Sequence, residues 1–425
     1  LSKGSVLTTS SIGTLNFCEW ICLGLLVAAM GKSAQMPLQV WLPDSMAGPT
    51  PISALIHAAT MVTAGIYLIA RFAPWFELAP IMSFNVVFIG FTTMILMGIV
   101  AIFEYDIKRI IAYSTLSQLG MMIGVCGLSG YTLSLYHLAT HAAFKALLFL
   151  GAGAIIIAAD HEQDIRKIGS MRHFPTIHLA MLVGLASMMA IPPLSGFFSK
   201  DAMLLLGGSQ NMMGILLIGA VITAIYSTRL YYWLFWQPKQ SVLMIHVPYS
   251  VRWPLWVLGF FSVYLGYWMV PFLPVLQASL GISSTKILPI LATLQQTDQF
   301  LLHAFSSPVL SLILSCAIGT FILLWCKPGK LDDLLNRFSQ LVGVINSQYG
   351  LNPLFERVVV NTYQKLSRYC FDKIDQRVID QQMVLGTASR ILVASKPLVK
   401  LSDGRLYHYI MVMVFGVFIL LVGLL

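Results

Sequence analysis

Three titratable residues recur four positions apart within the apolar stretch YHLATHAAFKALLF: His137, His141 and Lys145. This spacing places all three on one face of a helix. Two histidines so spaced could bind zinc, but the sequence offers no third ligand at a suitable spacing. We interpret the three as a row of proton-exchanging groups, because histidine titrates in the physiological range and ionisable residues are costly inside a membrane.

Two more lysines accompany proline-rich interruptions of apolar segments. Lys32 is followed by Pro37, the first of several prolines, and Lys200 follows the pair Pro192 and Pro193. Irregular backbone at membrane depth is tolerated only where protein or a water-filled cavity surrounds the freed polar groups. Either lysine could simply extend to the membrane surface, but the adjacent breaks favour buried lysines that exchange protons.

Three further polar residues are candidates for supporting roles. His57, within SALIHAATM, is either a hydrogen-bonded core residue or a member of the same relay. Asp201 directly follows Lys200. Lys108 lies in a charged corner, where it either caps a helix at the membrane surface or reaches inward.

The composition indicates a membrane protein. The chain has 425 residues, of which 57% are hydrophobic and 10% charged. This balance excludes an ordinary soluble domain, and recurring apolar runs of about 20 residues predict transmembrane helices. The six cysteines form no metal or disulfide pattern, and no nucleotide, haem or iron–sulfur motif is present, so we expect no cofactor in this chain and no nucleic-acid partner.

We predict an all-α polytopic protein with about ten transmembrane helices, two of them broken by proline. The predicted spans leave most lysines and arginines on one side of the membrane. That side collects Lys108, Arg109, Arg166, Lys167, Arg172, Lys239, Arg252 and residues 327–405. The excess of basic residues predicts that this side is cytoplasmic, or faces the matrix or stroma in an organelle.

The broken helices also suggest an internal repeat. Paired interrupted helices in corresponding positions of two halves point to a transport site between repeats. The second break has several spans ahead of it, whereas the first comes almost at the start of the chain. We therefore expect that part of a longer protein precedes Leu1.

Several segments resemble one family closely. The segments are GKSAQMPLQVWLPDSMAGPTPISALIHAATMVTAGIYLIAR, DIKRIIAYSTLSQLG, YHLATHAAFKALLFLGAG, HEQDIRKIG and LSGFFSKD. Together they resemble the antiporter-like membrane-arm subunits of respiratory complex I, NADH:quinone oxidoreductase. The polar stretch between the last two spans resembles the lateral helix of the most distal of these subunits.

The resemblance implies a domain organisation. Residues 1–71 would be the remainder of a first antiporter-like repeat, and 84–236 a second repeat inverted relative to it. Residues 253–327 would add transmembrane helices, 328–405 a long lateral amphipathic helix on the cytoplasmic side, and 406–425 a C-terminal transmembrane anchor.

The resemblance also implies a mechanism, in which proton half-channels meet a central row of buried lysines and histidines. Charge would move along Lys32, His57, His137 and His141, Lys145 and then Lys200. In the family, a glutamate of an earlier helix pairs with the lysine that Lys32 matches. This chain lacks that glutamate, and Glu19 does not match its motif.

We therefore expect a proton-translocating subunit of NADH:quinone oxidoreductase in a bacterial inner membrane, or in a mitochondrial inner or thylakoid membrane. NADH, flavin, iron–sulfur clusters and quinone would belong to partner subunits. The lateral helix would brace neighbouring membrane-arm subunits, or lie on lipid alone. Two alternatives are the large subunit of a multisubunit Na⁺/H⁺ antiporter and a purely structural scaffold.

Overall fold

The computed structural model describes residues 11–12, 15–168, 170–209, 211–237, 247–281, 286–326, 339–401 and 403–424. Lys239 and residues 327–338, which entered the predictions of orientation and domains, lie outside these ranges. The chain divides into two compact units, Leu1–Leu351 and Asn352–Leu425. This division is coarser than the five segments predicted from the sequence, whose boundaries stay a prediction.

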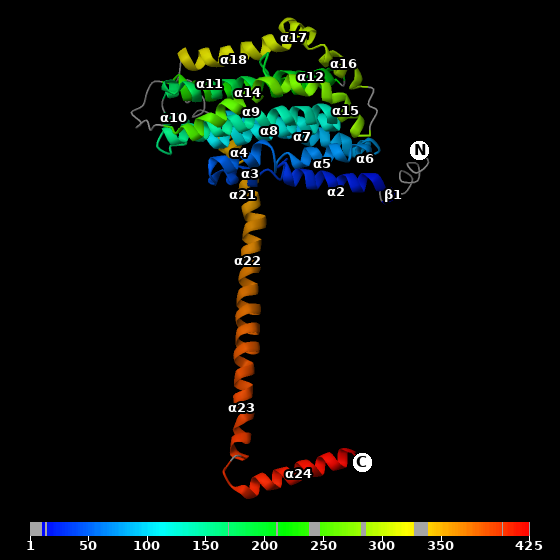
Figure 1. Cartoon of the computed structure of the whole chain (residues 1–425), viewed down its shortest axis with the longest axis vertical. Coiled ribbons are helices and arrows are strands. Elements are labelled where there is room, and N and C mark those ends of the chain that lie inside the picture. Colours follow the sequence, from blue (N-terminus) through cyan, green and yellow to red (C-terminus); the bar gives the residue numbers. More distant parts are fainter. Residues whose placement is uncertain are drawn as a thin grey trace. The chain divides into compact units, whose positions relative to one another are not determined.

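The first unit is built of helices, with a two-stranded antiparallel ribbon at its start (Figure 1). Its elements are β1 (Ser11–Ile12), β2 (Leu15–Asn16), α2 (Phe17–Lys32), α3 (Trp41–Asp44), η1 (Ser45–Ala47), α4 (Thr50–Ala58), α5 (Ala64–Arg71), α6 (Ala73–Glu77), α7 (Pro80–Phe103), α8 (Ile107–Gly127), α9 (Tyr131–Ala158), α10 (Ile165–Ile168), η2 (Met171–His173), α11 (Pro175–Met188), α12 (Ser195–Ser209), α13 (Met213–Phe235), α14 (Tyr249–Met269), η3 (Val270–Phe272), α15 (Leu273–Ser279), α16 (Leu288–Gln295), α17 (Thr297–Ser306), α18 (Pro308–Cys326) and α20 (Ser339–Asn346).

Seven described helices are long and apolar enough to cross a membrane. Each of the ten predicted spans contains a described helix, and the three outside those seven are divided into shorter pieces. The prediction of an all-α polytopic membrane protein with broken helices is confirmed.

Helix α8 is the centre of the first unit. It is buried along almost its whole length and packs on α7 and α9. Glycines permit the close approach to α7: a Cβ on Gly120 would lie 2.6 Å from the Gly90 carbonyl oxygen. Gly120 and Gly124 form the small-xxx-small pattern that lets membrane helices pack closely. The polar side chains of α8 are therefore enclosed in the protein.

The second predicted break is found where the prolines place it. Helix α11 ends at Met188 and α12 begins at Ser195, with the peptide bond between Pro192 and Pro193 in the cis form. The first break follows α2, which ends at Lys32, and the Met36–Pro37 bond is also cis.

The span that contains His57 differs from the prediction, because it is also interrupted. Helix α4 ends at Ala58, and α5 begins only at Ala64. Side-chain hydroxyls compensate for the lost helical bonds: Thr60 donates to the Leu55 carbonyl (2.8 Å), and Thr63 donates to the Ala59 carbonyl (3.0 Å). A threonine can bond to a preceding carbonyl in place of the backbone, so this break needs no proline.

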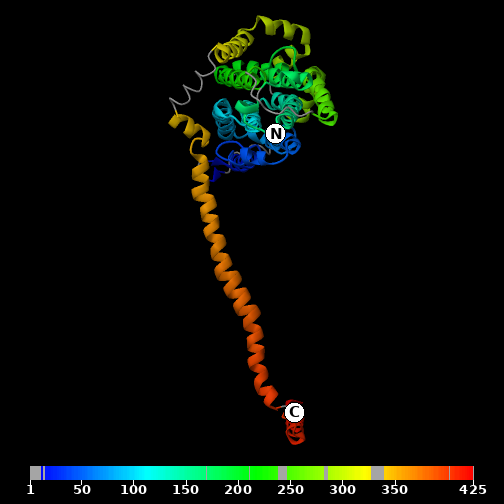
Figure 2. The same cartoon turned by 90° about the vertical axis from the view of Figure 1, so that its left-hand side faces the viewer.

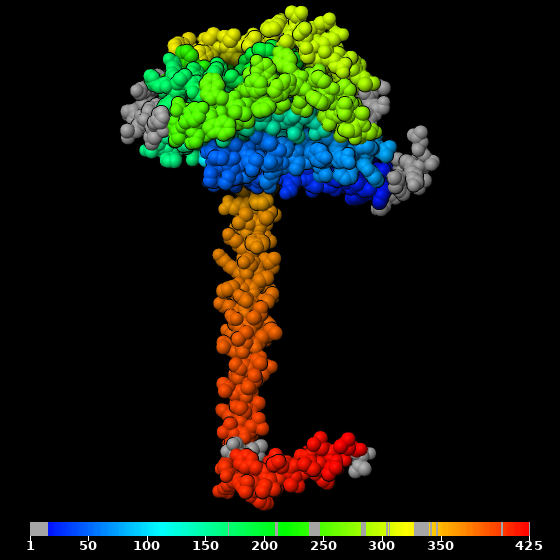
Figure 3. Space-filling model, viewed as in Figure 1, coloured from blue at the N-terminus to red at the C-terminus, as the bar shows by residue number. Residues whose placement is uncertain are grey.

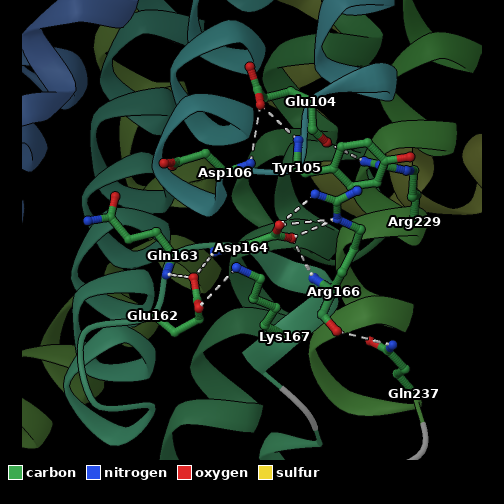
Figure 4. Close-up of polar contacts among 10 residues, drawn as sticks. All are labelled: Glu104, Tyr105, Asp106, Glu162, Gln163, Asp164, Arg166, Lys167, Arg229 and Gln237. Atoms are coloured by element: carbon green, nitrogen blue, oxygen red, sulfur yellow. Dashed lines mark hydrogen bonds and ion pairs between the residues drawn. The ribbon is translucent and has the colours of Figure 1, made fainter. Parts of the chain in front are cut away.

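Two corners of similar sequence meet at one end of the first unit. Glu104–Ile110 reads EYDIKRI and Glu162–Ile168 reads EQDIRKI. In each corner the glutamate accepts from the next two backbone amides, and the aspartate accepts from the amide two residues on. Antiparallel backbone bonds join the corners at Asp106 and Asp164: the Ile107 amide donates to the Gln163 carbonyl and the Ile165 amide to the Tyr105 carbonyl, both at 3.0 Å. Figure 4 shows the polar contacts of the side chains in the two corners. Their basic residues therefore share one side, as the predicted orientation requires.

The second unit consists of a long helix followed by a shorter one. The long helix runs without a break through α21 (Leu351–Phe355), η4 (Glu356–Val360), α22 (Asn361–Tyr369), η5 (Cys370–Leu385) and α23 (Gly386–Leu401), as Figure 2 shows. The shorter helix that follows is α24 (Leu406–Leu424), whose length and composition fit a membrane span. The long helix is confirmed, and its lateral course along neighbouring subunits stays a prediction.

Candidate proton-transfer site

Helix α9 carries the predicted row into the interior of the first unit. His137, His141 and Lys145 are buried, with at most 1% of each residue exposed. The ring centroids of the two histidines lie 6.3 Å apart, which agrees with one helical turn. The ring nitrogens of His141 have no close hydrogen-bond partner within the described residues, and the ring packs edge-on against Phe144. The single face predicted from the spacing is confirmed.

Lys200 lies at the second break and bonds to the end of the broken helix. Its Nζ donates to the Met188 carbonyl and to Thr223 Oγ1, both at 3.3 Å. Met188 is the last residue of α11, so its carbonyl has no partner within that helix. The carboxyl end of a helix also carries partial negative charge, which favours a cation there. The break thus creates the polar position that a buried lysine requires.

Lys145 finds a different set of neutral partners on α8. Its Nζ donates to Ser114 Oγ at 2.6 Å and to the Ile111 carbonyl at 3.3 Å. Within the described residues, no carboxylate lies within ion-pair distance of Lys145 or Lys200. A buried ammonium without a carboxylate is costly, so the charge on each lysine depends strongly on the other charges nearby.

A chain of hydrogen bonds connects His137 to Lys200. Ser199, next to Lys200, lies 2.9 Å from His137 Nδ1, and Gln118 Oε1 lies 3.4 Å from His137 Nε2. The Gln118 amide nitrogen donates in turn to Thr223 Oγ1 (3.2 Å) and Tyr226 Oη (3.3 Å). Thr223 therefore contacts both Gln118 and Lys200.

The other end of the row approaches His57. The His57 ring is buried, lies 5.2 Å from the ring of Phe149, and its Nε2 is 3.2 Å from Ser45 Oγ. Phe149 is one turn beyond Lys145 on α9. The spatial order is therefore His57, Lys145, His141, His137, Lys200. The order expected from the sequence, with His137 and His141 beside His57 and Lys145 beside Lys200, is wrong. The His137 end of the row contacts Ser199, next to Lys200, and the Lys145 end leads to Phe149 and His57.

Lys32 differs from the other members of the row, because its side chain is exposed on this chain. The prediction from the sequence that this side chain is buried is wrong for the chain by itself. Helix α2 packs on α5, α6 and α7, and Ala29, Met30 and Ser33 near its end are buried, but the Lys32 side chain is not covered. In the space-filling view, the early part of the chain, coloured blue, covers one edge of the first unit (Figure 3).

The supporting residues take different positions. Lys108 is 6% exposed and reaches inward, where its Nζ donates to the Gly48 carbonyl (3.3 Å) at the first break. Its backbone amide is capped by Asp106. Asp201 is largely buried and lines a small gap between α12 and α18. Lys108 thus joins the start of α8 to the first break.

Sequence reasoning missed several polar residues of the site. They are Ser114 and Gln118 on α8, Ser199 on α12, and Thr223 and Tyr226 on α13. Arg229 on α13 is a further buried polar residue that was missed, and it lies at the corner loop. Arg229 is 1% exposed; its guanidinium donates to the Glu104 carbonyl (2.8 Å) and lies 4.8 Å from the centre of the Tyr105 ring (Figure 4). A polar residue inside an apolar span was the available signal, and it could have found Gln118 and Arg229.

The corner loops have their own electrostatics outside the membrane spans. Burial raises the pKa of the Asp164 carboxyl, but hydrogen bonds from Arg166 and its charge outweigh burial, so that the pKa lies below its ordinary value. The same guanidinium lies 4.0 Å from the centre of the Tyr105 ring. Arg166 therefore connects the two corners, through an ion pair with Asp164 and a cation–π contact with Tyr105.

A family match covers just over half of the chain, at residues 7–227. The chain belongs to the transmembrane family of NADH:quinone oxidoreductases and Mrp antiporters. It is an integral membrane protein with several spans, as the sequence predicted.

Two relatives are similar to this chain over most of its length. The chain is 35% identical over 94% of its length to NADH-quinone oxidoreductase subunit L of Neisseria meningitidis serogroup A, and 37% identical to NADH-ubiquinone oxidoreductase chain 5 of Phytophthora infestans. It covers 64% and 62% of those two proteins, which is less than two thirds of their length. The predicted resemblance is confirmed.

Solved structures share the fold. A chain of the Mrp complex from Dietzia sp. matches 89% of this chain with a TM-score of 0.65 and 26% identity, and the match covers 41% of that chain. A chain of respiratory complex I from Thermus thermophilus matches 62% of this chain with a TM-score of 0.54 and 23% identity; the match covers 59% of that chain and concerns the fold alone.

Proposed function

We propose that this chain is a proton-translocating membrane subunit of an NADH:quinone oxidoreductase. The proposal rests on one observation, a buried row of titratable residues that crosses the first unit between the two breaks. The row consists of His57, Lys145, His141, His137 and Lys200. The names of the relatives with 35–37% identity support the assignment to this complex.

The row can pass a change in charge from one end to the other. Each buried lysine is held by neutral oxygens, so its protonation responds to a neighbouring charge. Coulomb interactions are strong where water is excluded. A proton that arrives at Lys200 is expected to disfavour charge on Lys145, and the histidines between them can carry the transfer.

Gln118 and Ser199 would orient His137 within this row. An amide does not exchange protons readily, so Gln118 is a positioning residue. It contacts one nitrogen of the His137 ring while Ser199 contacts the other. Together they determine which nitrogen carries the proton, since a neutral imidazole has one donor and one acceptor.

Oxidation of NADH and reduction of quinone would take place in partner subunits, which hold the flavin and the iron–sulfur clusters. The chain would receive energy from them through the membrane arm. A bacterial inner membrane is the proposed location, and the long helix of the second unit is the proposed brace against neighbouring subunits.

The Mrp likeness supports a second candidate, the large subunit of a Na⁺/H⁺ antiporter. The Dietzia chain has a higher TM-score and identity than the complex I chain. An antiporter would use the same row but would require sodium. Proton movement driven by NADH in sodium-free buffer distinguishes the two.

The test is NADH-driven proton pumping in inverted membrane vesicles that carry Lys145→Ala in the full-length gene. Lys145 is central in the row, so we expect assembled complex whose pumping per electron falls by about 10²-fold, a typical loss for a proton-transfer group. Lys167→Ala is the matched control, because that side chain is 66% exposed and forms a weak surface pair with Glu162.

Assembly is checked in parallel from the amount of intact complex in the membrane. Normal pumping per electron by assembled Lys145→Ala complex would refute the relay and leave the chain a scaffold. Loss of pumping by Lys167→Ala as well would show a general effect of lysine removal.

A further inference from the structure

Helix α14 packs on both of the helices that meet at the Lys200 end of the row. It contacts α9, which carries His137, and α12, which carries Ser199 and Lys200 (Figure 1). The predicted second repeat ends at residue 236, so α14 lies outside it. The residues assigned to the relay lie on other helices, and the contacts of α14 with this end of the row therefore have a separate role.

Two buried hydroxyls donate to the backbone of α14 one helical turn apart. Tyr136 Oη on α9 donates to the Gly266 carbonyl at 2.6 Å. Ser195 Oγ on α12 donates to the Ser262 carbonyl, also at 2.6 Å. Both donors are completely buried. Residues four apart lie on one face of a helix, so a single strip of α14 binds α9 and α12 together.

Gly266 allows α12 to approach this strip closely. A Cβ at Gly266 would lie 2.8 Å from Ser195 Cα and 3.0 Å from the Ser195 carbonyl oxygen. Small residues permit such close packing of membrane helices. Next to this contact, the rings of Phe198 and Tyr267 pack edge to face, with their centroids 4.4 Å apart. The first turn of α12 is therefore fixed on α14 by both polar and apolar contacts.

Each donor also lies close to a residue of the site. Tyr136 directly precedes His137 on α9. Ser195 lies one turn before Ser199 on α12. Ser199 Oγ is 2.9 Å from His137 Nδ1 and 2.8 Å from Thr140 Oγ1. A hydrogen bond weakens steeply as its geometry departs from the ideal, so these contacts depend on how α9 and α12 are held.

We propose that α14 positions the contact between His137 and Ser199, with Tyr136 and Ser195 as positioning residues. The strip of α14 holds α9 and α12 at the separation that this contact requires. Neither hydroxyl carries a proton along the row, because each donates to a backbone carbonyl that passes no proton on. The inference rests on the proposed proton relay and extends its supporting structure to a helix outside the second repeat.

NADH-driven pumping per electron in inverted vesicles tests the positioning, with the amount of intact complex measured in parallel. Tyr136→Phe and Ser195→Ala, each in the full-length gene, should lower pumping by about fivefold, as expected for the loss of one buried hydrogen bond. Tyr264→Phe on α14 and Ser311→Ala on α18 are the matched controls, because both residues are exposed. Pumping by the controls should be unchanged.

A double variant separates positioning from a general structural defect. Ser199→Ala removes the hydroxyl that His137 contacts. If Tyr136 acts through this contact, Tyr136→Phe should lower pumping no further in the Ser199→Ala background, because the effects of coupled residues are not additive. The pH profile of pumping should also change in the same way in the two single variants.

A pair of glycine variants on α14 gives a measurement that does not depend on pumping. Gly266→Ala pushes α14 away from α12, whereas a Cβ at Gly259 meets no atom within 4 Å. Hydrogen exchange of the intact complex is followed by mass spectrometry in peptides that contain residues 195–199. Exchange there should increase several-fold in Gly266→Ala and stay unchanged in Gly259→Ala.

Three results would overturn the proposal. They are normal pumping by assembled Tyr136→Phe and Ser195→Ala complexes, fully additive losses in the double variant, and unchanged exchange at residues 195–199 in Gly266→Ala. Normal pumping by Lys145→Ala would instead refute the relay itself. The exchange measurement would then still decide whether α14 holds the first turn of α12.

Discussion

The two broken-helix regions share a construction and differ in burial. In each, a serine beside the break donates to a distant carbonyl at 2.6 Å: Ser33 to Val62 in the first, and Ser195 to Ser262 in the second. In each, a lysine stands close to the break. Yet Lys200 is 1% exposed and Lys32 is exposed.

The difference lies in the neighbours. Helix α12 is packed by α9, α13, α14 and α16, and one of these supplies Thr223 to Lys200. Helix α2 contacts α5, α6 and α7. A break supplies free backbone carbonyls, but helices distant in sequence decide whether the adjacent lysine is enclosed.

The largest expected effect distinguishes the two lysines. Lys200→Ala in the full-length gene should reduce NADH-driven pumping per electron by about 10²-fold, because Lys200 ends the buried row. Lys32→Ala, measured in the same vesicles, should have a smaller effect if Lys32 stays exposed in the complex. An equal loss would mean that other parts of the assembled complex enclose Lys32, and normal pumping by Lys200→Ala would contradict the relay.

The next largest effect is expected on stability, for substitutions of the glycines that are packed at the two breaks. A Cβ on Gly196 would lie 1.9 Å from the Ser187 carbonyl oxygen, and one on Gly65 would lie 2.6 Å from the Ala29 carbonyl oxygen. Gly196→Ala and Gly65→Ala should each destabilise the protein by about 1–3 kcal/mol, measured as thermal denaturation in detergent.

Gly24→Ala is the control for both packing variants. A Cβ there meets no atom within 4 Å. Because alanine favours a helix more than glycine does, this variant should be as stable as the unaltered protein or more stable, by about 1 kcal/mol at most. If Gly65→Ala were tolerated as well as Gly24→Ala, the first break would be looser than the second.

A smaller effect is expected within the second region alone. Gln118→Met keeps the side-chain length but removes the contacts with His137 and Thr223. Loss of a buried hydrogen bond costs about 1 kcal/mol, so pumping per electron should fall about fivefold and its pH profile should change. Ser117→Ala is the control, since Ser117 is buried on the same helix but donates to the Met94 carbonyl. An unchanged pH profile would remove Gln118 from the site.

The smallest effect concerns the corner loop outside the spans. Because the pKa of Asp164 lies below its ordinary value of 3.8, its carboxylate stabilises the folded state above that pH. The contribution is lost as the pH falls below 3.8 toward the lowered pKa. Thermal denaturation should show Asp164→Asn less stable than the unaltered protein at pH 7 by under about 1 kcal/mol. The two should converge in acid, and a difference that persists there would contradict the assignment.

The sequence predicted the features that depend on local pattern. Apolar length predicted the spans, paired prolines predicted the break before Ser195, and the four-residue spacing placed Lys145 on one face with two histidines. These follow from helix geometry and from proline, which act over a few residues.

Features that depend on distant contacts were not predictable in this way. The order of the row required the direction in which α9 passes the breaks. The contact of Gln118 with Thr223 joins residues that lie 105 positions apart. The interruption after His57 depends on threonine hydroxyls, which occur equally in unbroken helices.

The paired corners at Asp106 and Asp164 have a mechanical consequence. They tie the start of α8 to the segment after α9, so that these two helices form a hairpin closed at both ends. Lys145–Ser114 and His137–Gln118 are contacts within this hairpin. His137–Ser199 and Gln118–Thr223 join the hairpin to α12 and α13, and Lys200–Thr223 joins α12 to α13. A movement of the hairpin against α12 and α13 would therefore change the contacts at the Lys200 end of the row and leave those of Lys145 intact.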